Sequence, residues 1–290
     1  MKSGFVSIIG KPNVGKSSIL NAIIGQKVSI VTPKNQTTRN SIQGIYNDDD
    51  SQIIFIDTPG IHKPISELGT KMDKESYSSI RDCELSLFIV DASKPFNDGD
   101  QYLFDHLKFD CPLIVVFNKI DLTNVELISN LKKRYDDFYH PVAIIETSAV
   151  ENFGINDLIK CIKENLEEGP QYFDVETITN RDLAFRVQEI IREKLLLLLK
   201  EEVPHSSAVI CQEIKGSKSG LDIFAKIVVE KDGQKGIIIG SKGKMIKKIG
   251  IRAREDIEKT IGKHVNLQLV VQVEENWRNK PSFLLQNIFK

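Results

Sequence analysis

The sequence has few cysteines and lacks any long apolar run. Its four cysteines, Cys83, Cys111, Cys161 and Cys211, stand far apart, and no two of them have the spacing of a metal-binding or redox motif. We therefore expect reduced thiols, as in a cytosolic protein. The run Leu195–Leu199 is far too short to cross a bilayer, so we expect it in a buried helix and expect no transmembrane segment.

The chain also lacks internal repeats, low-complexity segments and room for a signal peptide. Residues 1–5 lead directly into a strand-like segment, which indicates a cytoplasmic protein without a leader. Of the 290 residues, 41% are hydrophobic and 27% are charged, which permits one large domain or two ordinary ones with packed cores.

The formal net charge of −1 conceals an asymmetry along the chain. Residues 181–290 contain 21 Lys/Arg and 14 Asp/Glu, a net charge of +7, whereas residues 1–180 contain 18 and 26, a net charge of −8. A basic C-terminal third on an acidic body suggests a polyanionic partner for that third. The alternative is two solvated surfaces that happen to differ in charge.

Strand and helix patterns alternate over residues 5–165. Short apolar runs typical of buried strands cover residues 6–9, 53–56, 85–90, 113–117 and 143–146. This alternation predicts an α/β fold with a mainly parallel, doubly wound sheet. Ligands of such sheets bind beyond the C-terminal ends of the strands.

The alternation stops at Glu167-Glu168-Gly169-Pro170, which predicts a first domain of residues 1–168, a linker of 169–180 and a second, α+β domain of 181–290. For the second domain the patterns predict an amphipathic helix, two paired strands, a glycine loop, a helix, a strand and a final packed helix. The first five of these elements cover residues 183–200, 207–214 with 221–230, 236–243, 244–261 and 265–273.

A complete phosphate-binding loop follows the first predicted strand. It consists of Gly10, Lys11, Pro12, Asn13, Val14, Gly15, Lys16 and Ser17, with Ser18 directly after it. Glycines let backbone N–H groups curl around a phosphate, and the next helix adds its positive N-terminal end. Lys16 can reach the outer phosphates, and the Ser17 hydroxyl can bind Mg²⁺.

A second loop, Asp57-Thr58-Pro59-Gly60, follows the run at 53–56. A carboxylate at a strand end can hold Mg²⁺ through water, and the Gly60 N–H can sense the terminal phosphate. Between these two loops, the polar segment 33–40 predicts a nucleotide-dependent switch. In that segment we favour Thr38 over Thr37 as a further Mg²⁺ ligand.

Two later loops have the pattern of a guanine site. Asn118-Lys119-Ile120-Asp121 follows a buried strand, and its Asp121 carboxylate can accept hydrogen bonds from an edge of guanine on which adenine presents an acceptor. Asn118 can bridge the base and the phosphate loop, and the Lys119 stem can lie over the ring. Ser148 and Ala149 follow the last strand as a supporting loop whose backbone N–H faces the guanine oxygen.

These loops together resemble the translation-factor-related GTPases, and further residues resemble the bacterial Era family. The resemblance rests on Pro12-Asn13, Gln36-Thr37-Thr38-Arg39, Asp57-Thr58-Pro59-Gly60-Ile61-His62 and the segment Gly240-Ser241-Lys242-Gly243, which fits the GxxG loop of a type II KH domain. It implies a monomer with a P-loop GTPase domain and a KH domain that binds GTP, GDP and Mg²⁺. It further implies that the protein grips the 3′ end of small-subunit ribosomal RNA during 30S maturation, and it allows loose membrane association.

The residues themselves also favour RNA binding, because a GxxG loop lets backbone N–H groups approach the phosphates of a single strand. The candidate RNA-binding residues are Gly240, Ser241, Lys242, Gly243, Lys244, Lys247, Lys248 and Arg252, with Arg254 nearby. Residues 237–239 and Ile246 can form an apolar bed for bases, although core positions are the more ordinary interpretation. Family members often carry lysine where Ser241 stands, which puts one phosphate contact in doubt.

For catalysis we assign Lys16, Thr38 and Gly60. Ras-like GTPases place glutamine after the glycine of the second loop to orient the attacking water, and here Ile61 cannot do so. His62 follows it, more as a surface histidine than as a substitute base. We therefore expect slow intrinsic hydrolysis. In related GTPases an asparagine at the position of Asn13 helps to hold K⁺, so either K⁺ binding or loop shaping is possible here.

Two other functions fit the sequence. One is a signalling GTPase whose basic C-terminal domain docks to a membrane surface or a protein. The other is an RNA chaperone with an inactive nucleotide pocket. RNA binding through the loop 240–243 would argue against the first alternative. Turnover of GTP would exclude the second.

Overall fold

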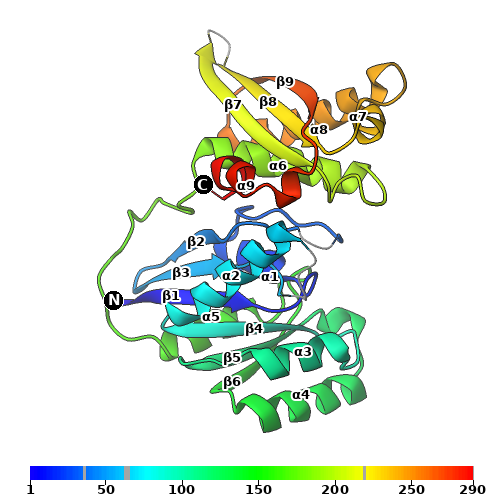
Figure 1. The fold of residues 1–290 in the computed structure, drawn as a ribbon. Coiled ribbons are helices and arrows are strands. Elements are labelled where there is room, and N and C mark those ends of the chain that lie inside the picture. The colour runs from blue at the N-terminus through cyan, green and yellow to red at the C-terminus, as the bar shows by residue number, and fades with distance from the viewer. Residues whose placement is uncertain (35–36, 62–65, 218–219, 290) are drawn as a thin grey trace. The chain divides into compact units, whose positions relative to one another are not determined.

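The computed structural model describes residues 1–34, 37–61, 66–217 and 220–289, and it contains two compact units. The first unit ends at Asn180 and the second begins at Arg181. Figure 1 shows a sheet flanked by helices in the first unit and a smaller sheet with its own helices in the second. His62, Asn35 and Gln36, which the sequence analysis named, lie outside the described residues.

Within the described residues, the first unit has six strands in the order β2-β3-β1-β4-β5-β6. These strands are β1 (Lys2–Ile9), β2 (Ile42–Asn47), β3 (Ser51–Asp57), β4 (Leu85–Asp91), β5 (Leu113–Asn118) and β6 (Ala143–Thr147). All neighbours pair in parallel except β2 and β3, which are antiparallel. The sequence analysis missed β2, since Gly44 interrupts its short apolar pattern. That glycine leaves room for Leu20, whose Cδ1 would lie 2.6 Å from an added Cβ.

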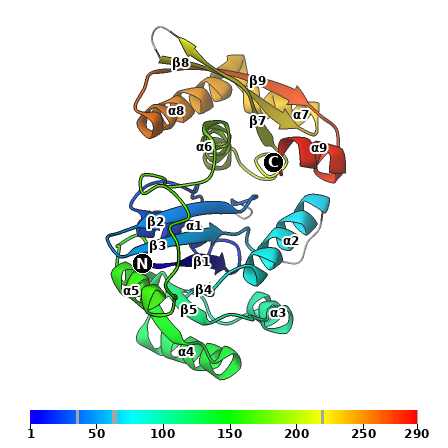
Figure 2. The ribbon, with the colours of Figure 1, turned by 90° about the vertical axis from the view of Figure 1, so that its left-hand side faces the viewer.

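Helices cover both faces of this sheet (Figure 2). They are α1 (Lys16–Ile24), α2 (Glu67–Arg81), α3 (Asp98–His106), α4 (Val125–Tyr139) and α5 (Ile155–Glu164), with a 3-10 turn η1 at Ile120–Leu122. Ile19 of α1 and Leu158 of α5 pack into one apolar core, and Leu103 of α3 and Leu131 of α4 pack into another. Because the strands are parallel, the loops after β1, β3, β5 and β6 meet at one edge of the sheet.

The second unit is an α+β domain. Its elements are α6 (Leu183–Leu198), β7 (Ala208–Ser217), β8 (Gly220–Val229), α7 (Asp232–Ile239), the 3-10 turn η2 (Ser241–Gly243), α8 (Lys244–Ile261), β9 (Val265–Val273), the 3-10 turn η3 (Trp277–Asn279) and α9 (Pro281–Asn287). The strands follow the order β7-β8-β9, antiparallel and then parallel. One sheet face packs on α6 and α8 through Ile191, Ile249 and Ala253. The structure has the predicted α/β first domain with a mainly parallel sheet and the predicted α+β second domain.

The segment predicted as a linker is hydrogen-bonded along the edge of the first sheet. Gln52 of β3 is fully buried, and its Oε1 accepts hydrogen bonds from the backbone N–H groups of Tyr172 (2.7 Å) and Phe173 (2.9 Å). Its Nε2 donates to the Phe173 carbonyl at 2.8 Å. The N–H of Ile45 on β2 donates to the Ile178 carbonyl at 3.0 Å. The polypeptide between α5 and Asn180 is therefore part of the first unit.

Replacing Gln52 should release this segment. In Gln52→Leu the two backbone N–H groups lose their acceptor, which should lower the free energy of unfolding by about 1–3 kcal/mol. Cleavage by chymotrypsin after Tyr172 and Phe173 should accelerate, and both changes can be followed by urea unfolding and timed proteolysis. The control is Gln101→Leu on the exposed surface of α3. Equal cleavage rates in the two variants would show that Gln52 does not hold the segment.

Candidate functional site

The phosphate-binding loop joins β1 to α1 and is closely packed. A Cβ on Gly10 would lie 2.4 Å from the Ile89 carbonyl oxygen, and one on Gly15 would lie 2.1 Å from Asn118 Nδ2. Gly15 also has a positive φ of 102°, which disfavours other residues. These positions explain why the loop carries glycine where it does, since the backbone must curl within reach of its neighbours.

Two charged groups of opposite sign are buried beside this loop. Lys16 Nζ donates to the carbonyls of Gly10 (3.0 Å) and Lys11 (2.9 Å), and burial lowers its pKa to about 8, with Asp57 acting in the opposite direction. Burial likewise raises the pKa of Asp57, against hydrogen bonds from hydroxyl groups and the charge of Lys16. Each group therefore lacks full compensation for its charge within the protein.

Three oxygen-bearing side chains meet at the end of β3. Ser17 Oγ donates to Asp57 Oδ2 at 2.7 Å and lies 3.0 Å from Thr38 Oγ1. The second carboxylate oxygen, Asp57 Oδ1, is buried and has no hydrogen-bond partner among the described residues. Two hydroxyls and a buried carboxylate form a hard, oxygen-only donor set, which fits Mg²⁺.

The two threonines of the switch segment differ in their contacts. Thr37 Oγ1 donates to the Lys34 carbonyl at 2.6 Å and lies 2.7 Å from Thr32 Oγ1, so it is used within its own loop. Thr38 instead turns toward Ser17, and it is 6% exposed. The preference for Thr38 as a Mg²⁺ ligand stays a prediction.

The sequence analysis missed Ser29. This residue is 1% exposed, and its Oγ donates to Asp57 Oδ2 at 2.8 Å, beside the bond from Ser17. Both hydroxyls thus hold the same carboxylate oxygen and leave Oδ1 for another ligand. A lone serine after α1 has no pattern that could have identified it from the sequence.

The second loop contacts the first through its backbone. A Cβ on Gly60 would lie 2.7 Å from both the N and the Cα of Pro12, so only glycine fits there. Thr58 Oγ1 donates to the Ile8 carbonyl at 2.7 Å and anchors the loop to β1. Ile61 is 1% exposed within an apolar core, and its N–H donates to the Gly10 carbonyl at 3.3 Å. Its side chain therefore points away from any substrate.

The base-binding loop is also tied to the phosphate loop. Asn118 Nδ2 donates to the Val14 carbonyl at 2.9 Å, and Asn118 Oδ1 accepts from the Ala149 N–H at 3.2 Å. The Ser148 N–H, assigned to guanine with that of Ala149, donates to the Phe153 carbonyl at 3.1 Å. Asp121 is exposed in η1. The expected residues lie in one region, with the two supporting N–H groups bound to protein acceptors in this structure.

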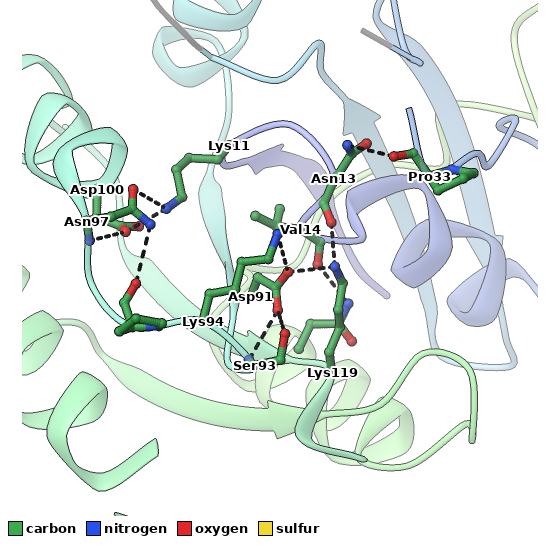
Figure 3. A network of polar contacts seen from close by, with 12 residues as sticks. Lys11, Asn13, Val14, Pro33, Asp91, Ser93, Lys94, Asn97, Asp100 and Lys119 are labelled. Atoms are coloured by element: carbon green, nitrogen blue, oxygen red, sulfur yellow. Dashed lines mark hydrogen bonds and ion pairs between the residues drawn. The ribbon is translucent and has the colours of Figure 1, made fainter. Parts of the chain in front are cut away.

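Further ion pairs surround the loop, and Figure 3 shows them. Asp91, at the end of β4, lies 2.7 Å from Lys119 Nζ and 3.6 Å from Lys94 Nζ. Burial opposes ionisation of Asp91, but hydrogen bonds from Lys119 and Ser93 lower its pKa overall. Lys119 Nζ also donates to the Asn13 carbonyl at 2.6 Å. Asp91, which the sequence analysis did not name, therefore positions the lysine of the base-binding loop.

Asn13 and Lys11 link the phosphate loop to its neighbours (Figure 3). Asn13 has a positive φ of 63°, and its Nδ2 donates to the Pro33 carbonyl at 3.1 Å in the switch segment. Lys11 Nζ lies 2.5 Å from Asp100 Oδ2 and donates to Asn97 Oδ1 at 3.3 Å at the start of α3. The loop is thus connected both to the switch segment and to α3.

A second candidate site lies in the second unit, around the GxxG loop. Gly240, Lys242 and Gly243 all have positive φ values, of 70°, 51° and 73°. The predicted RNA-binding residues Ser241, Lys242, Lys244, Lys247, Lys248 and Arg252 are all exposed. A groove of about 570 Å³ lies between α8 and β9, and its lining includes Ile246, Lys247, Arg254 and Leu267.

The isoleucines near the loop have separate roles. Ile238 is fully buried, as a core residue should be, whereas Ile237 is 52% exposed and Ile246 lines the groove. The interpretation of these residues as core was therefore correct for Ile238 and wrong for Ile237. Arg254, which the sequence analysis placed near the basic residues of the loop, lines the groove. Its buried Nε has no hydrogen-bond partner among the described residues.

A phosphate-binding loop, a buried carboxylate and a guanine-type loop at the edge of a parallel sheet, followed by a domain with a GxxG loop, define a P-loop GTPase with a KH domain. Family models agree: residues 5–119 match the family described as 50S ribosome-binding GTPase, and residues 202–278 match the KH domain. The chain belongs to the Era family of GTPases, as its full-length relatives show.

Two of these relatives are named GTPase Era. The protein from Thermosipho melanesiensis is 47% identical over 291 residues, covering 99% of this chain and 97% of the relative. The protein from Lactobacillus helveticus is 47% identical over 287 residues, covering 98% and 95%. The protein is therefore a GTPase, and its expected identification is confirmed.

Two solved structures are similar over their whole length. One is a tyrosine-to-alanine variant of Era from Aquifex aeolicus bound to GDP and AlF4⁻, with 37% identity and a TM-score of 0.94, covering 100% of this chain and 99% of that one. The other is Era in complex with MgGDPNP and nucleotides 1506–1542 of 16S ribosomal RNA, with the same identity, TM-score and coverage. Binding of guanine nucleotide with Mg²⁺ is thereby supported.

Ser29 should control the affinity for Mg²⁺. In Ser29→Ala the Asp57 carboxylate loses one of its two hydroxyl donors and becomes free to rotate, so the Mg²⁺ concentration needed to retain bound GDP should rise about tenfold, equivalent to about 1.4 kcal/mol. Fluorescent GDP release at graded Mg²⁺ concentrations measures this. Ser3→Ala, which removes a buried hydroxyl bonded to the Pro170 carbonyl, is the matched control. Unchanged Mg²⁺ dependence in Ser29→Ala would contradict the role.

Proposed function

We propose that this GTPase grips the 3′ end of small-subunit ribosomal RNA in the groove between α8 and β9, and assists maturation of the 30S subunit. The nucleotide-bound state of the first unit controls that grip. The observation that carries the proposal is the groove between α8 and β9, which combines cationic and apolar side chains and lies on the helix that follows the GxxG loop. The relative bound to MgGDPNP and 16S ribosomal RNA supports the same assignment.

The start of α8 is unusually rich in positive charge for a helix N-terminus. Its first turn contains no acidic residue, while Lys244, Lys247 and Lys248 are exposed there. A helix N-terminus is already positive through its dipole, so these lysines destabilise it unless an anion binds. The phosphates of a single RNA strand would neutralise both sources of charge.

The groove itself suits unstacked bases. Ile246 and Leu267 offer apolar surface, whereas Arg254 and Asn266 present hydrogen-bonding groups along the same groove. Bases of a single strand can be held by apolar and planar cationic groups while their edges are hydrogen-bonded. Arg254, with its unpartnered Nε, is the residue that we assign to a base or phosphate of the RNA.

Hydrolysis follows from groups that bind phosphate rather than from a general base. Lys16 stabilises charge on the outer phosphates, and Ser17, Thr38 and Asp57 hold Mg²⁺, which supplies further positive charge when bound. Gly60 presents its backbone beside Pro12, where the terminal phosphate would lie. Because Ile61 is part of the core, no side chain at that position orients water, and we expect slow intrinsic hydrolysis.

We further infer that Asn13 assists a potassium ion in hydrolysis. Its amide lies at the junction of the phosphate loop and the switch segment, where Nδ2 meets the Pro33 carbonyl. An amide and carbonyl oxygens can ligate a monovalent cation, which would offset charge that develops during phosphoryl transfer.

Among the described residues, no helix is long and apolar enough to cross a membrane.

The GxxG loop should be essential for RNA affinity. The double variant Ser241→Asp with Lys242→Asp places negative charge against the RNA phosphates, so affinity for a synthetic 16S 3′-end RNA should fall at least about tenfold. GDP affinity should stay unchanged. The control Lys200→Ala with Lys259→Asp changes the net charge equally at exposed positions outside the GxxG loop.

The same variants separate RNA binding from membrane docking. Binding to vesicles of anionic phospholipid, with RNA affinity that survives the double variant and does not depend on salt, would favour the signalling alternative. Loss of RNA binding in the double variant alone, with a steep salt dependence in the native protein, supports the ribosomal function.

Potassium should accelerate hydrolysis through Asn13. Single-turnover GTP hydrolysis should be at least about tenfold faster in KCl than in NaCl of equal ionic strength, and Asn13→Ala should abolish the difference. The control Asn124→Ala, at the start of α4, should keep it. Equal rates in the two salts would exclude the potassium role without affecting the assignment as a GTPase.

A further inference from the structure

A second cluster of reactive side chains lies in the first unit, at the opposite end of the strands from the phosphate loop. Cys83 leads from α2 into β4, and Cys111 leads into β5. Although 28 residues separate them, their Sγ atoms are 3.7 Å apart. The sequence spacing predicted no paired thiols, and the parallel pairing of β4 with β5 brings them together.

Two buried hydroxyls complete this thiol cluster. Ser7 and Ser86 face each other on β1 and β4, and their Oγ atoms are 2.8 Å apart. Cys83 Sγ lies 3.3 Å from Ser7 Oγ, and Cys111 Sγ lies 3.2 Å from Ser86 Oγ. Both cysteines are partly exposed.

The two thiols of the cluster have pKa values shifted in opposite directions. Hydrogen bonds from Cys111, Ser7 and Ser86 stabilise the thiolate of Cys83 and hold its pKa well below the usual range, although burial opposes this. By contrast, the hydrogen bond with Cys83 and burial raise the pKa of Cys111, and burial raises the pKa of Cys161. Thiolates rather than thiols are the nucleophiles, so Cys83 should be the most reactive of these cysteines at neutral pH.

We propose that Cys83 and Cys111 are a redox-active pair, in which Cys83 reacts with hydrogen peroxide and Cys111 resolves the product as a reversible disulfide. In the first step the Cys83 thiolate attacks one peroxide oxygen. The S–O bond forms, the O–O bond breaks, and the hydroxide that leaves takes up a proton to give water.

The second step uses the neighbouring thiol. Cys111 loses its proton and attacks the sulfur of the Cys83 sulfenic acid, so that the S–S bond forms and the S–O bond breaks. The hydroxide that leaves takes up the proton and gives a second water. Overall the two thiols lose two electrons and two protons, and the peroxide is reduced to two waters.

The two sulfur atoms are already close to bonding distance. They lie 3.7 Å apart and have to close to about 2.05 Å to form a disulfide. Cys83 Sγ also contacts the Ile80 carbonyl, at 3.2 Å, in the last turn of α2. The disulfide would therefore tie the end of the helix that follows the Asp57–Gly60 loop to the start of β5.

Peptide mapping of the full chain tests the proposal. The reduced protein is treated with a few equivalents of hydrogen peroxide at pH 7, and the remaining thiols are then alkylated under denaturing conditions. Trypsin cuts after Lys108, between the two cysteines, but not before Pro95. We expect a disulfide-linked pair of peptides 82–108 and 109–119, a mass lower by two hydrogens, and reversal by dithiothreitol.

Single variants assign the two roles. Cys111→Ser should leave a Cys83 sulfenic acid that dimedone traps, whereas Cys83→Ser should protect Cys111 from peroxide. Cys161→Ser and Cys211→Ser, which change the remaining cysteines, should form the disulfide as the native chain does. In the native protein, iodoacetamide should modify Cys83 at least about tenfold faster than Cys161 at pH 7.

Other outcomes would overturn the proposal. The first is that peroxide oxidises Cys83 no faster than Cys161. The second is that disulfides form equally between other cysteines. The third is that a sulfenic acid accumulates on Cys111 in Cys83→Ser. Circular dichroism and GDP binding of each variant confirm that it is folded. Serine and cysteine have nearly equal volumes, so these substitutions should leave the fold intact. The alkylation rates of the native chain test the pair without any variant.

Discussion

The nucleotide site depends on two opposite charges that the fold buries without fully satisfying them. Lys16 and Asp57 are 6% and 0% exposed. Burial lowers the pKa of Lys16 and raises the pKa of Asp57, and both shifts favour the neutral form of the side chain. Lys16 is held by carbonyl oxygens, and Asp57 keeps one oxygen without a partner among the described residues. A phosphate beside Lys16 and Mg²⁺ beside Asp57 would supply the charges that are lacking. Nucleotide and metal would then stabilise the folded first unit by binding only its native state.

The same constraint requires the loops to pack against one another. Gly10, Gly15 and Gly60 each stand where a Cβ would meet a neighbouring loop or strand within 2.1–2.7 Å. The loops after β1, β3 and β5 thus form one rigid wall of the nucleotide site, since a shift of any one loop would make it collide with the next. The switch segment differs, because Thr38 and Pro33 contact that wall through single hydrogen bonds. Changes in the nucleotide should accordingly move the switch segment and leave the wall in place.

Much of this could be predicted from the sequence, because each nucleotide loop is a continuous motif that follows an apolar strand. The helix at 244–261 and the strand at 265–273 were predicted with these bounds, since each has a clean period and Gly243 and Gly262 delimit the helix. What the sequence could not show depends on contacts between distant segments. Gln52 holds residues 172–173, Ser29 holds Asp57, and Cys83 meets Cys111 only once the strands pair. A glycine within β2 likewise makes sense only against Leu20.

The two reactive ends of the first sheet share structural elements. β1 carries Ser7 of the thiol cluster and ends where the phosphate loop begins. α2 lies between the second nucleotide loop and Cys83 in the chain, and its last turn contacts the Cys83 sulfur. A covalent tie at Cys83 would restrict the C-terminal end of α2, whereas the nucleotide acts on the loop before its N-terminal end. Since a packed helix moves as a rigid body, restraint at one end limits the positions open to the other.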